Sequence, residues 1–276
     1  MAYFQSESLQ DLSPGTVGLL GVPWDEGSTF MRGPAGAPEQ IRQQLYSGSA
    51  NLCTESGIDL GSHAGFVDLG DLQLGHGEAV RQEIEMRAGE LLERGLRVLS
   101  IGGDHAVTAP LLAAHAKVYP DIEILHFDAH PDLYDEYDGD RYANACPFAR
   151  IMEAGHAKRL VQVGIRTMNP HQRKQADRFG VEVIEMKDFD AMRRFRFDGP
   201  VYLSFDIDVF DPAFAPGVSH YEPGGMSTRD ALSVIQNFEG RLVGADLVEF
   251  NPERDASGMT AMVGAKLLKE IAARLI

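Results

Sequence analysis

The chain has 276 residues, of which 44% are hydrophobic and 24% are charged, the composition of a globular protein large enough to bury one sizeable core. Its formal net charge of −16 argues against a nucleic-acid partner, because phosphate contacts need a basic face. No run approaches the length of a membrane span, residues 1–10 lack the apolar core of a signal peptide, and two cysteines are too few for a disulfide framework. We therefore expect a cytoplasmic protein with no membrane partner.

Eight short apolar runs follow one another along the chain, with helical patterns between most of them. The predicted strands cover residues 17–22, 65–69, 96–101, 122–127, 160–165, 181–184, 201–207 and 242–248. Two segments carry an apolar stripe with helical spacing: Val80, Ile84, Ala88, Leu91 and Leu92 in the first, and Met262, Val263, Leu267, Ile271 and Leu275 near the C-terminus. Alternating strands and helices predict a mostly parallel sheet covered on both faces, in a single α/β domain over residues 1–276.

Four of these strands run into polar clusters at their C-terminal ends. The clusters are Gly102-Gly103-Asp104-His105, Asp128-Ala129-His130-Pro131-Asp132, Asp206-Ile207-Asp208, and Glu249 with Asn251. Ligands of open α/β sheets bind beyond the carboxyl ends of the strands. If these four strands are neighbours, their polar ends meet in one cleft.

The clusters supply six candidate metal ligands. They are His105, Asp128, His130, Asp132, Asp206 and Asp208. Strand alternation would place Asp206 and Asp208 on one side of their strand, and Asp128 and His130 likewise. Mixed imidazole and carboxylate ligands suit Mn, Fe, Co or Zn, and the excess of carboxylates favours Mn. One such motif alone is usually a turn or a solvated strand end, but three of them at strand ends predict a site for two metal ions.

A pair of metal ions with a shared water can present hydroxide to an electrophilic carbon or phosphorus atom. The motif loops hold few arginines or lysines for a phosphate group, and Glu222, Glu249 and Glu253 favour a cationic substrate instead. We interpret His126 and Asp104 as residues that support the ligands or cap a turn, because the six-ligand set is already sufficient.

Together these motifs resemble the ureohydrolase family, which includes arginases, agmatinases and related guanidino hydrolases. The resemblance extends over nearly the whole chain, through Gly21-Val22-Pro23, Ala215-Pro216-Gly217, Glu222-Pro223-Gly224-Gly225 and residues 246–252. The stretches Gly217-Val218-Ser219-His220 and Phe148 to Glu153 are most similar to the plant-type arginase branch, which is itself agmatinase-like.

The resemblance implies a three-layer α/β/α fold with a mostly parallel sheet of about eight strands, two Mn²⁺ ions and a homo-oligomer, trimer or hexamer. It assigns His105, Asp128, Asp132 and Asp206 to one ion, and Asp128, His130, Asp206 and Asp208 to the other. The reaction it implies is attack of a bridging hydroxide on the carbon of a small cationic guanidino substrate, giving urea and an amine. Asp128 would accept a proton from the water, and Glu249 would bind the guanidinium.

One position departs from the family pattern. Asn144 occupies the place of a histidine that is proposed as a proton shuttle, and asparagine cannot exchange a proton near neutral pH. The enzyme is then slow, uses another shuttle such as His220, or has a substrate with a different leaving group. Cys146 lacks an identifiable base beside it and is interpreted as a structural thiol.

The choice of substrate stays open at the level of sequence. Arginine needs groups for its carboxylate and ammonium, and neither Asn51, Ser219 nor the acidic loop residues decide the matter. The alternatives to an arginine or agmatine hydrolase are an enzyme for another guanidine or amidine, and a catalytically weak family member that binds metal.

Overall fold

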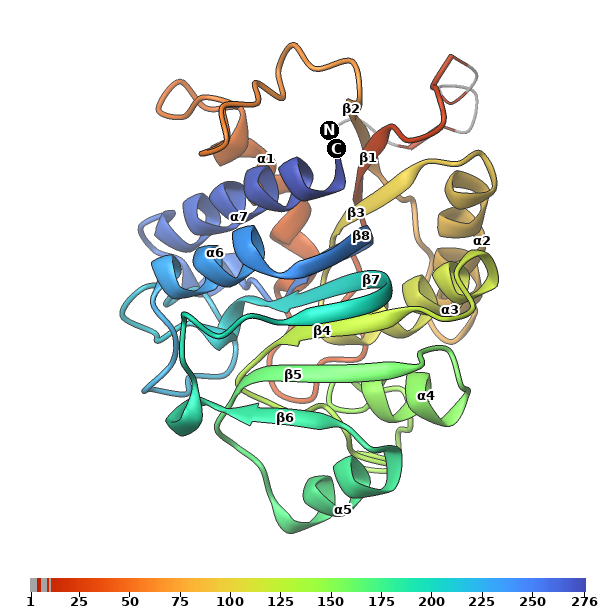
Figure 1. The fold of residues 1–276 in the computed structure, drawn as a ribbon, viewed down its shortest axis with the longest axis vertical. Coiled ribbons are helices and arrows are strands. Elements are labelled where there is room, and N and C mark those ends of the chain that lie inside the picture. Colours follow the sequence, from red (N-terminus) through yellow and green to blue (C-terminus); the bar gives the residue numbers. More distant parts are fainter. Residues whose placement is uncertain (1–3, 6–8, 10) are drawn as a thin grey trace.

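A single eight-stranded sheet runs through the computed structural model, which describes residues 4–5, 9 and 11–276 (Figure 1). The strand order is β2-β1-β3-β8-β7-β4-β5-β6, and every neighbouring pair is parallel. The strands are β1 Val17–Gly21, β2 Phe66–Asp71, β3 Arg97–Ile101, β4 Glu123–Phe127, β5 Arg159–Ile165, β6 Glu182–Glu185, β7 Arg196–Asp206 and β8 Glu239–Val248. The predicted α/β architecture with eight strands is confirmed.

Helices cover both faces of the sheet, so that the molecule has three layers (Figure 1). One face carries α1 Ala37–Leu45, α6 Thr228–Asn237 and α7 Met259–Leu275. The other carries α2 Ala79–Glu93, α3 Thr108–Val118, α4 Pro147–Glu153 and α5 Pro170–Phe179. Short 3₁₀ turns lie in the connections: η2 Pro34–Gly36, η3 His105–Val107, η4 Met186–Asp188, η5 Ile207–Val209 and η6 Pro252–Arg254.

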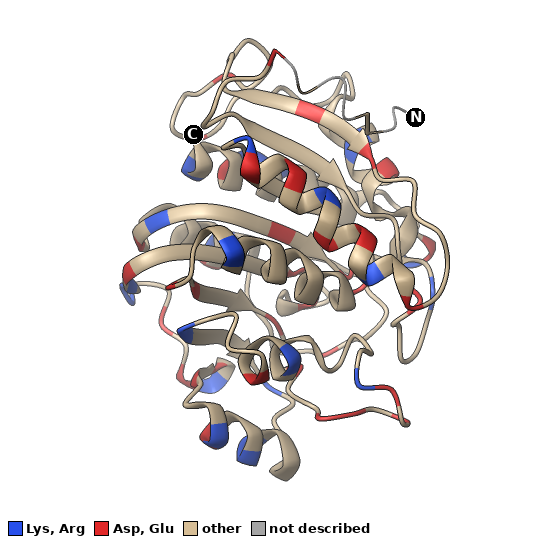
Figure 2. Cartoon of the chain, turned by 90° about the vertical axis from the view of Figure 1, so that its right-hand side faces the viewer, with Lys and Arg blue, Asp and Glu red and all other residues tan. Residues whose placement is uncertain are grey.

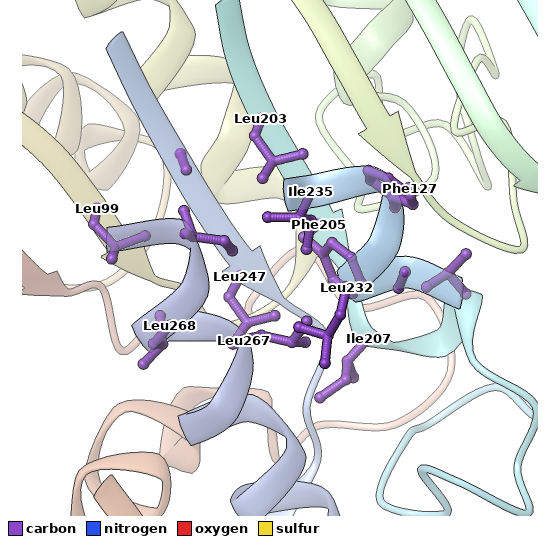
Figure 3. Packing of buried hydrophobic residues seen from close by; sticks show 14 of the residues in the cluster. Leu99, Phe127, Leu203, Phe205, Ile207, Leu232, Ile235, Leu247, Leu267 and Leu268 are labelled. Atoms are coloured by element: carbon purple, nitrogen blue, oxygen red, sulfur yellow. The ribbon is translucent and has the colours of Figure 1, made fainter. Parts of the chain in front are cut away.

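Each face of the sheet has its own hydrophobic core, because successive residues of a strand point to opposite faces. Leu203 and Phe205 of β7 pack toward α6 and α7, beside Leu232 and Leu267 (Figure 3). Tyr202 of the same strand points to the opposite core. This two-sided burial explains why the strands read as almost continuous apolar runs.

The predicted apolar stripe of α2 is buried along its whole length. In α7, Leu267, Ile271 and Leu275 are buried as predicted, but Met262 and Val263 are only partly buried. The first turns of α7 instead bury small residues, because Gly264 lies against Ile41 of α1. Close packing of two helices therefore shifts the buried face of α7 away from its largest side chains.

One row of polar side chains crosses the middle of the sheet. Strand register aligns Gln162, His126, Ser204, Asp246 and Ser100 on β5, β4, β7, β8 and β3. All five are fully buried. Polar groups are costly to bury unless hydrogen bonds compensate them. This row therefore marks the part of the sheet where the hydrophobic core ends and a candidate site begins.

Acidic and basic residues are interspersed on the outer surfaces of the helices in the view of Figure 2. Within the described residues, no helix is both long and apolar enough to cross a membrane.

Candidate metal centre

The four strands with polar ends are neighbours in the sheet, in the order β3-β8-β7-β4, so their ends meet as predicted. His105 opens η3 directly after β3, Asp206 is the last residue of β7, and Glu249 follows β8. The expectation that strand alternation aligns Asp206 with Asp208 is wrong, because β7 ends at Asp206 and Asp208 lies in η5.

The same correction applies to β4. That strand ends at Phe127, so Asp128 and His130 lie in the turn that follows it. The backbone N–H groups of His130 and Asp208 each donate to the carboxylate two residues earlier, at Asp128 and Asp206. Tight Asx-type turns of this kind reverse the chain direction. They therefore keep the ligands at the cleft, whereas a continued extended strand would place them beyond it.

His105 faces a cage of carboxylates. Its Nδ1 atom lies 3.2 Å from Asp128 Oδ2, 3.0 Å from Asp132 Oδ2 and 3.3 Å from Asp206 Oδ2. None of these contacts has hydrogen-bond geometry, although the nitrogen is fully buried. Nε2 donates to Ser204 Oγ at 3.0 Å, because that hydroxyl gives its own proton to Asp246 Oδ1 at 2.8 Å. Nδ1 therefore directs either a lone pair or an unmatched proton toward the three oxygens. The three carboxylates repel one another, and a cation among them would remove this repulsion.

His130 lies on the other side of the shared carboxylate. Its Nδ1 atom is 2.9 Å from Asp208 Oδ2 and 3.4 Å from Asp128 Oδ1. Two groups of three side chains are compact enough to hold a metal ion: His105, His126 and Asp128, and Asp128, His130 and Asp208. Asp128 belongs to both groups, as a bridging ligand requires.

His126 belongs to the first group by distance, but its protons argue against ligation. Gln162 Nε2 donates to His126 Nδ1 at 3.1 Å and to the carbonyl of Pro131 at 2.6 Å. His126 Nε2 is then protonated and donates to Asp128 Oδ2 at 2.9 Å. His126 therefore orients Asp128, in agreement with its predicted supporting role. Asp104 caps η3 by accepting from the N–H of Ala106, as the turn-capping interpretation predicts.

The electrostatics of the cage favour bound positive charge. Burial raises the pKa of Asp132 to about 7, and the negative charge of Asp128 adds to the rise. Burial also raises the pKa of Asp206, with further contributions from Asp208 and Asp128. Burial alone would lower the pKa of His130, but Asp208 and Asp128 outweigh it and raise that pKa. Divalent cations and protons thus compete for the same positions.

Glu249 lies beside this cage and is held in one orientation. Its Oε1 atom accepts from the N–H of His105 and from Asn144 Nδ2, both at 2.8 Å. Its own N–H donates to the carbonyl of Gly103. The backbone of Glu249 is left-handed, with φ 64°, as is that of Asp132, with φ 48°. Such conformations cost a non-glycine residue about 1–2 kcal/mol and are frequent at functional sites.

Asn144 is buried and connects two segments of the site. Its Oδ1 atom accepts from the N–H of Thr29 at 3.1 Å while Nδ2 donates to Glu249, and its own N–H donates to the carbonyl of Gly27. Both polar ends of the amide are therefore occupied by the protein. In this arrangement Asn144 is a fixed connection between the N-terminal loop and Glu249.

A cavity of about 180 Å³ opens above the cage. Its lining includes His130, Asp132, Asn144, Asp206, Asp208, His220 and Glu249, together with Thr29, Tyr134, Tyr137, Thr167 and Gln172. The His220 ring lies 5.5 Å from the ring of His130 and 5.4 Å from that of Phe30. The cavity therefore joins the candidate ligands, the candidate substrate carboxylate and the alternative proton carrier in one chamber.

Other sequence candidates lie outside the chamber. Cys146 is buried, its Sγ faces the carbonyl of Asp140, and burial raises the pKa of its thiol to about 12, in accord with a structural role. Asn51 is exposed on a distant loop, where its carbonyl oxygen accepts from Lys269. Ser219 is buried, and its hydroxyl accepts from Asn251. None of the three belongs to the lining of the cavity.

Sequence reasoning missed the supporting residues Gln162, Ser204, Asp246 and Arg166. Each lies in or just after a strand whose pattern reads as apolar core. The polar residue within or beside each of these apolar runs was the available clue.

The residues present fit a pair of divalent cations, because two imidazoles and four carboxylates converge and one imidazole nitrogen, His105 Nδ1, has no hydrogen-bond partner among the described residues. Fold and site together define a three-layer α/β/α protein with a cation cage at the ends of its parallel strands.

Comparison with known proteins agrees with this class. Residues 15–273 match the model of the arginase family. The chain is 45% identical to arginase 1, mitochondrial, of Arabidopsis thaliana over 93% of this chain and 80% of that protein. It is 38% identical to guanidinopropionase of Pseudomonas aeruginosa over 92% of this chain and 85% of that protein. The solved arginase from Medicago truncatula superposes with a TM-score of 0.91 at 40% identity, covering 98% of this chain and 90% of that one.

The chain belongs to the arginase family. It is a ureohydrolase, an enzyme of the class that acts on guanidino compounds, and its family uses a binuclear manganese centre.

Proposed function

We propose that this ureohydrolase binds two Mn²⁺ ions and hydrolyses a guanidino compound of the arginine or agmatine type to urea and an amine. One observation carries the proposal: the Nδ1 atom of His105 lies among three carboxylate oxygens, and the N–H of the same residue donates to Glu249, a buried carboxylate that lines the chamber. A cage of this composition attracts divalent cations, and a single buried carboxylate beyond it attracts a cationic substrate.

The proposed ligands are those of the sequence-based assignment. His105, Asp128, Asp132 and Asp206 would hold one ion, and Asp128, His130, Asp206 and Asp208 would hold the other. A pair of ions held there would supply hydroxide at neutral pH from a shared water. Asp128 would accept the proton of that water, with its carboxylate kept in orientation by the N–H of His126.

Glu249 is the proposed acceptor for the guanidinium group. Its Oε1 already accepts two hydrogen bonds, whereas Oε2 accepts none from the described residues. A guanidinium N–H can therefore bind Oε2 in a charge-assisted hydrogen bond. Because Asn144 and His105 prevent the carboxylate from rotating, the substrate carbon is held in a single position above the cage.

The leaving amine needs a proton, and Asn144 cannot supply one. His220 lines the same chamber, next to His130, and is our proposed alternative carrier. This position favours a route through His220, while a slower reaction and a substrate with a different leaving group are the other two interpretations of Asn144.

The tail of the substrate is set by the rest of the chamber. Apart from the candidate ligands, His220 and Glu249, its lining consists of neutral side chains, including Tyr134, Tyr137, Thr167 and Gln172. The similar proteins include one named as an arginase and one named as a guanidinopropionase, so this fold accepts different tails. The plant-like stretches of sequence favour arginine over agmatine.

The test is urea release by the Mn²⁺-loaded protein from arginine, agmatine, guanidinobutyrate and guanidinopropionate, each at several concentrations. We expect one substrate, arginine, to have the highest kcat/KM, and Glu249→Gln to abolish its turnover while bound Mn²⁺ stays at the wild-type level. Urea release from one of the other guanidines alone would show that this compound, and not arginine, is the substrate. Two bound ions with no urea from any compound would instead support the weakly catalytic family member.

The oligomeric state belongs to the proposal as well. We expect a homo-oligomer, trimer or hexamer, in the cytoplasm. Light scattering coupled to gel filtration would measure its mass, and a monomer at working concentration would contradict it.

A further inference from the structure

Arg166 follows the last residue of β5 and directs its guanidinium at main-chain oxygens alone. It donates to the carbonyls of Asp208 at 2.8 Å, Val209 at 3.1 Å and Phe210 at 3.2 Å. It also donates to the carbonyls of Glu222, at 2.6 Å and 2.9 Å, and Gly164, at 3.2 Å. The guanidinium thus joins η5, the 222 segment and the end of β5.

This pattern is unusual for a charged group. In the described part of the chain Arg166 forms no ion pair, so its charge is balanced by the dipoles of five carbonyl groups. The guanidinium presents several N–H groups in one plane, which lets it bond the carbonyls of three successive residues, 208–210, at once. Lysine has the charge of arginine but lacks this planar fork.

The backbone of the same residue holds a second ligand segment. The N–H of Arg166 donates to the carbonyl of Ala129 at 2.9 Å, and Thr167 Oγ1 donates to that oxygen at 3.0 Å. The N–H of Ala129 donates to Asp208 Oδ1 at 3.1 Å. Ala129 lies between Asp128 and His130, so Arg166 connects all three members of the group Asp128, His130 and Asp208.

The other group has different support. His105 is held by Ser204 and Asp246, and His126 by Gln162, with no contact to Arg166. Apart from the shared carboxylates Asp128 and Asp206, the two halves of the cage are therefore braced by separate sets of residues.

We infer that Arg166 is a positioning residue for one of the two metal positions, that of Asp128, His130 and Asp208. Its guanidinium keeps η5 in the conformation that aims the Asp208 carboxylate at His130, and it ties the 222 segment, close to His220, to the same point. The inference rests on the proposed metal centre for its consequence and on the hydrogen bonds above for its geometry.

The test compares Arg166→Lys with wild type in a Mn²⁺ titration followed by electron paramagnetic resonance. We expect one ion to bind about 10–100-fold more weakly, the range typical for loss of a residue that orients a ligand, while the other keeps its affinity. At limiting Mn²⁺ the spectrum should change from that of a coupled pair to that of a single ion. Hydrogen exchange should increase in residues 207–226.

Arg274→Lys is the matched control. Arg274 of α7 also donates to main-chain carbonyls, those of Phe238 and Gly240, but these lie at the start of β8, the opposite end of that strand from the site. We expect this variant to keep both ions and the wild-type exchange of residues 207–226.

The inference would be overturned if Arg166→Lys bound both ions with equally reduced affinity, or both with wild-type affinity. Fewer than two ions in the wild-type protein would contradict the proposed metal centre instead. In that case unchanged hydrogen exchange of residues 207–226 in Arg166→Lys would still overturn the structural role of Arg166, and increased exchange would support it.

Discussion

Asn144 shows how one residue can keep a position in a site and change its chemistry. Its amide donates to Glu249 and accepts from Thr29, so the connection between the N-terminal loop and the substrate carboxylate is intact. A histidine in its place could also donate one N–H to Glu249 and would have its second nitrogen free for a proton. The two side chains therefore differ in their capacity for proton transfer.

Asn144→His should raise kcat for this reason. General acid catalysis contributes about 10²–10⁴-fold to rates, so we expect a gain on the order of a hundredfold. Steady-state urea release measures it, with Asn144→Ala as the control that loses the bond to Glu249 and should only lose activity. No gain in Asn144→His, together with loss of turnover in His220→Ala, would assign the proton transfer to His220.

The two halves of the cage share Asp128, which lets single substitutions distinguish bridging from terminal ligands. Asp128→Asn should reduce bound Mn²⁺ by more than one ion per chain, because both positions use that carboxylate. Asp208→Asn should remove about one ion and leave the His105 side occupied. Elemental analysis after dialysis gives the stoichiometry, and full occupancy in both variants would contradict the ligand assignment.

At the scale of elements, the site depends on where strands stop. The apolar runs predicted all eight strands, and the polar clusters predicted which strand ends lie together. The positions of Asp128, His130 and Asp208 were predicted for the wrong reason, because all three lie in turns beyond their strands. A turn is stabilised by a few local hydrogen bonds, and these leave less trace in the residue pattern than a buried strand does.

Gly103 is a point where two such strand ends make close contact. A Cβ atom there would lie 1.8 Å from the carbonyl oxygen of Trp24, and the carbonyl of Gly103 accepts from the N–H of Glu249. Gly103→Ala should therefore destabilise the fold by about 1–3 kcal/mol, the usual cost of overpacking, and displace Glu249 enough to raise KM.

Gly89→Ala is its control, since nothing lies within 4 Å of a Cβ atom at that position in α2. It should stabilise the protein by about 0.5–1 kcal/mol, because alanine is the better helix former. Urea denaturation measures both changes, and equal stability of the two variants would refute the close contact at Gly103.

At the scale of the whole molecule, the buried histidines link stability to pH. His115 in α3 is fully buried against Tyr202, and burial lowers its pKa from 6.5 to about 4. Between these two values the unfolded chain binds a proton that the folded chain excludes, so stability falls as the pH falls. The full effect is on the order of 3 kcal/mol at 1.36 kcal/mol per pKa unit.

His115→Gln should flatten the dependence of unfolding free energy on pH between about 6.5 and 4, because glutamine does not titrate. Denaturant unfolding of the metal-free protein at several pH values measures the slope. His76→Gln, at an exposed histidine, is the matched control. A slope in His115→Gln as steep as in wild type would mean that other groups carry the acid sensitivity.

The sequence by itself determined the α/β fold, the eight strands, the six candidate ligands and the family, because alternating apolar runs and ligand motifs are local patterns. Tertiary structure decided that His126 is a donor to Asp128 and that Asn144 bonds Glu249. It also decided that Ser204 and Asp246 hold His105, and that Arg166 bonds the carbonyls of residues 208–210. These roles depend on strand register and on contacts between segments far apart in the chain, and such contacts leave no periodic signal in the sequence.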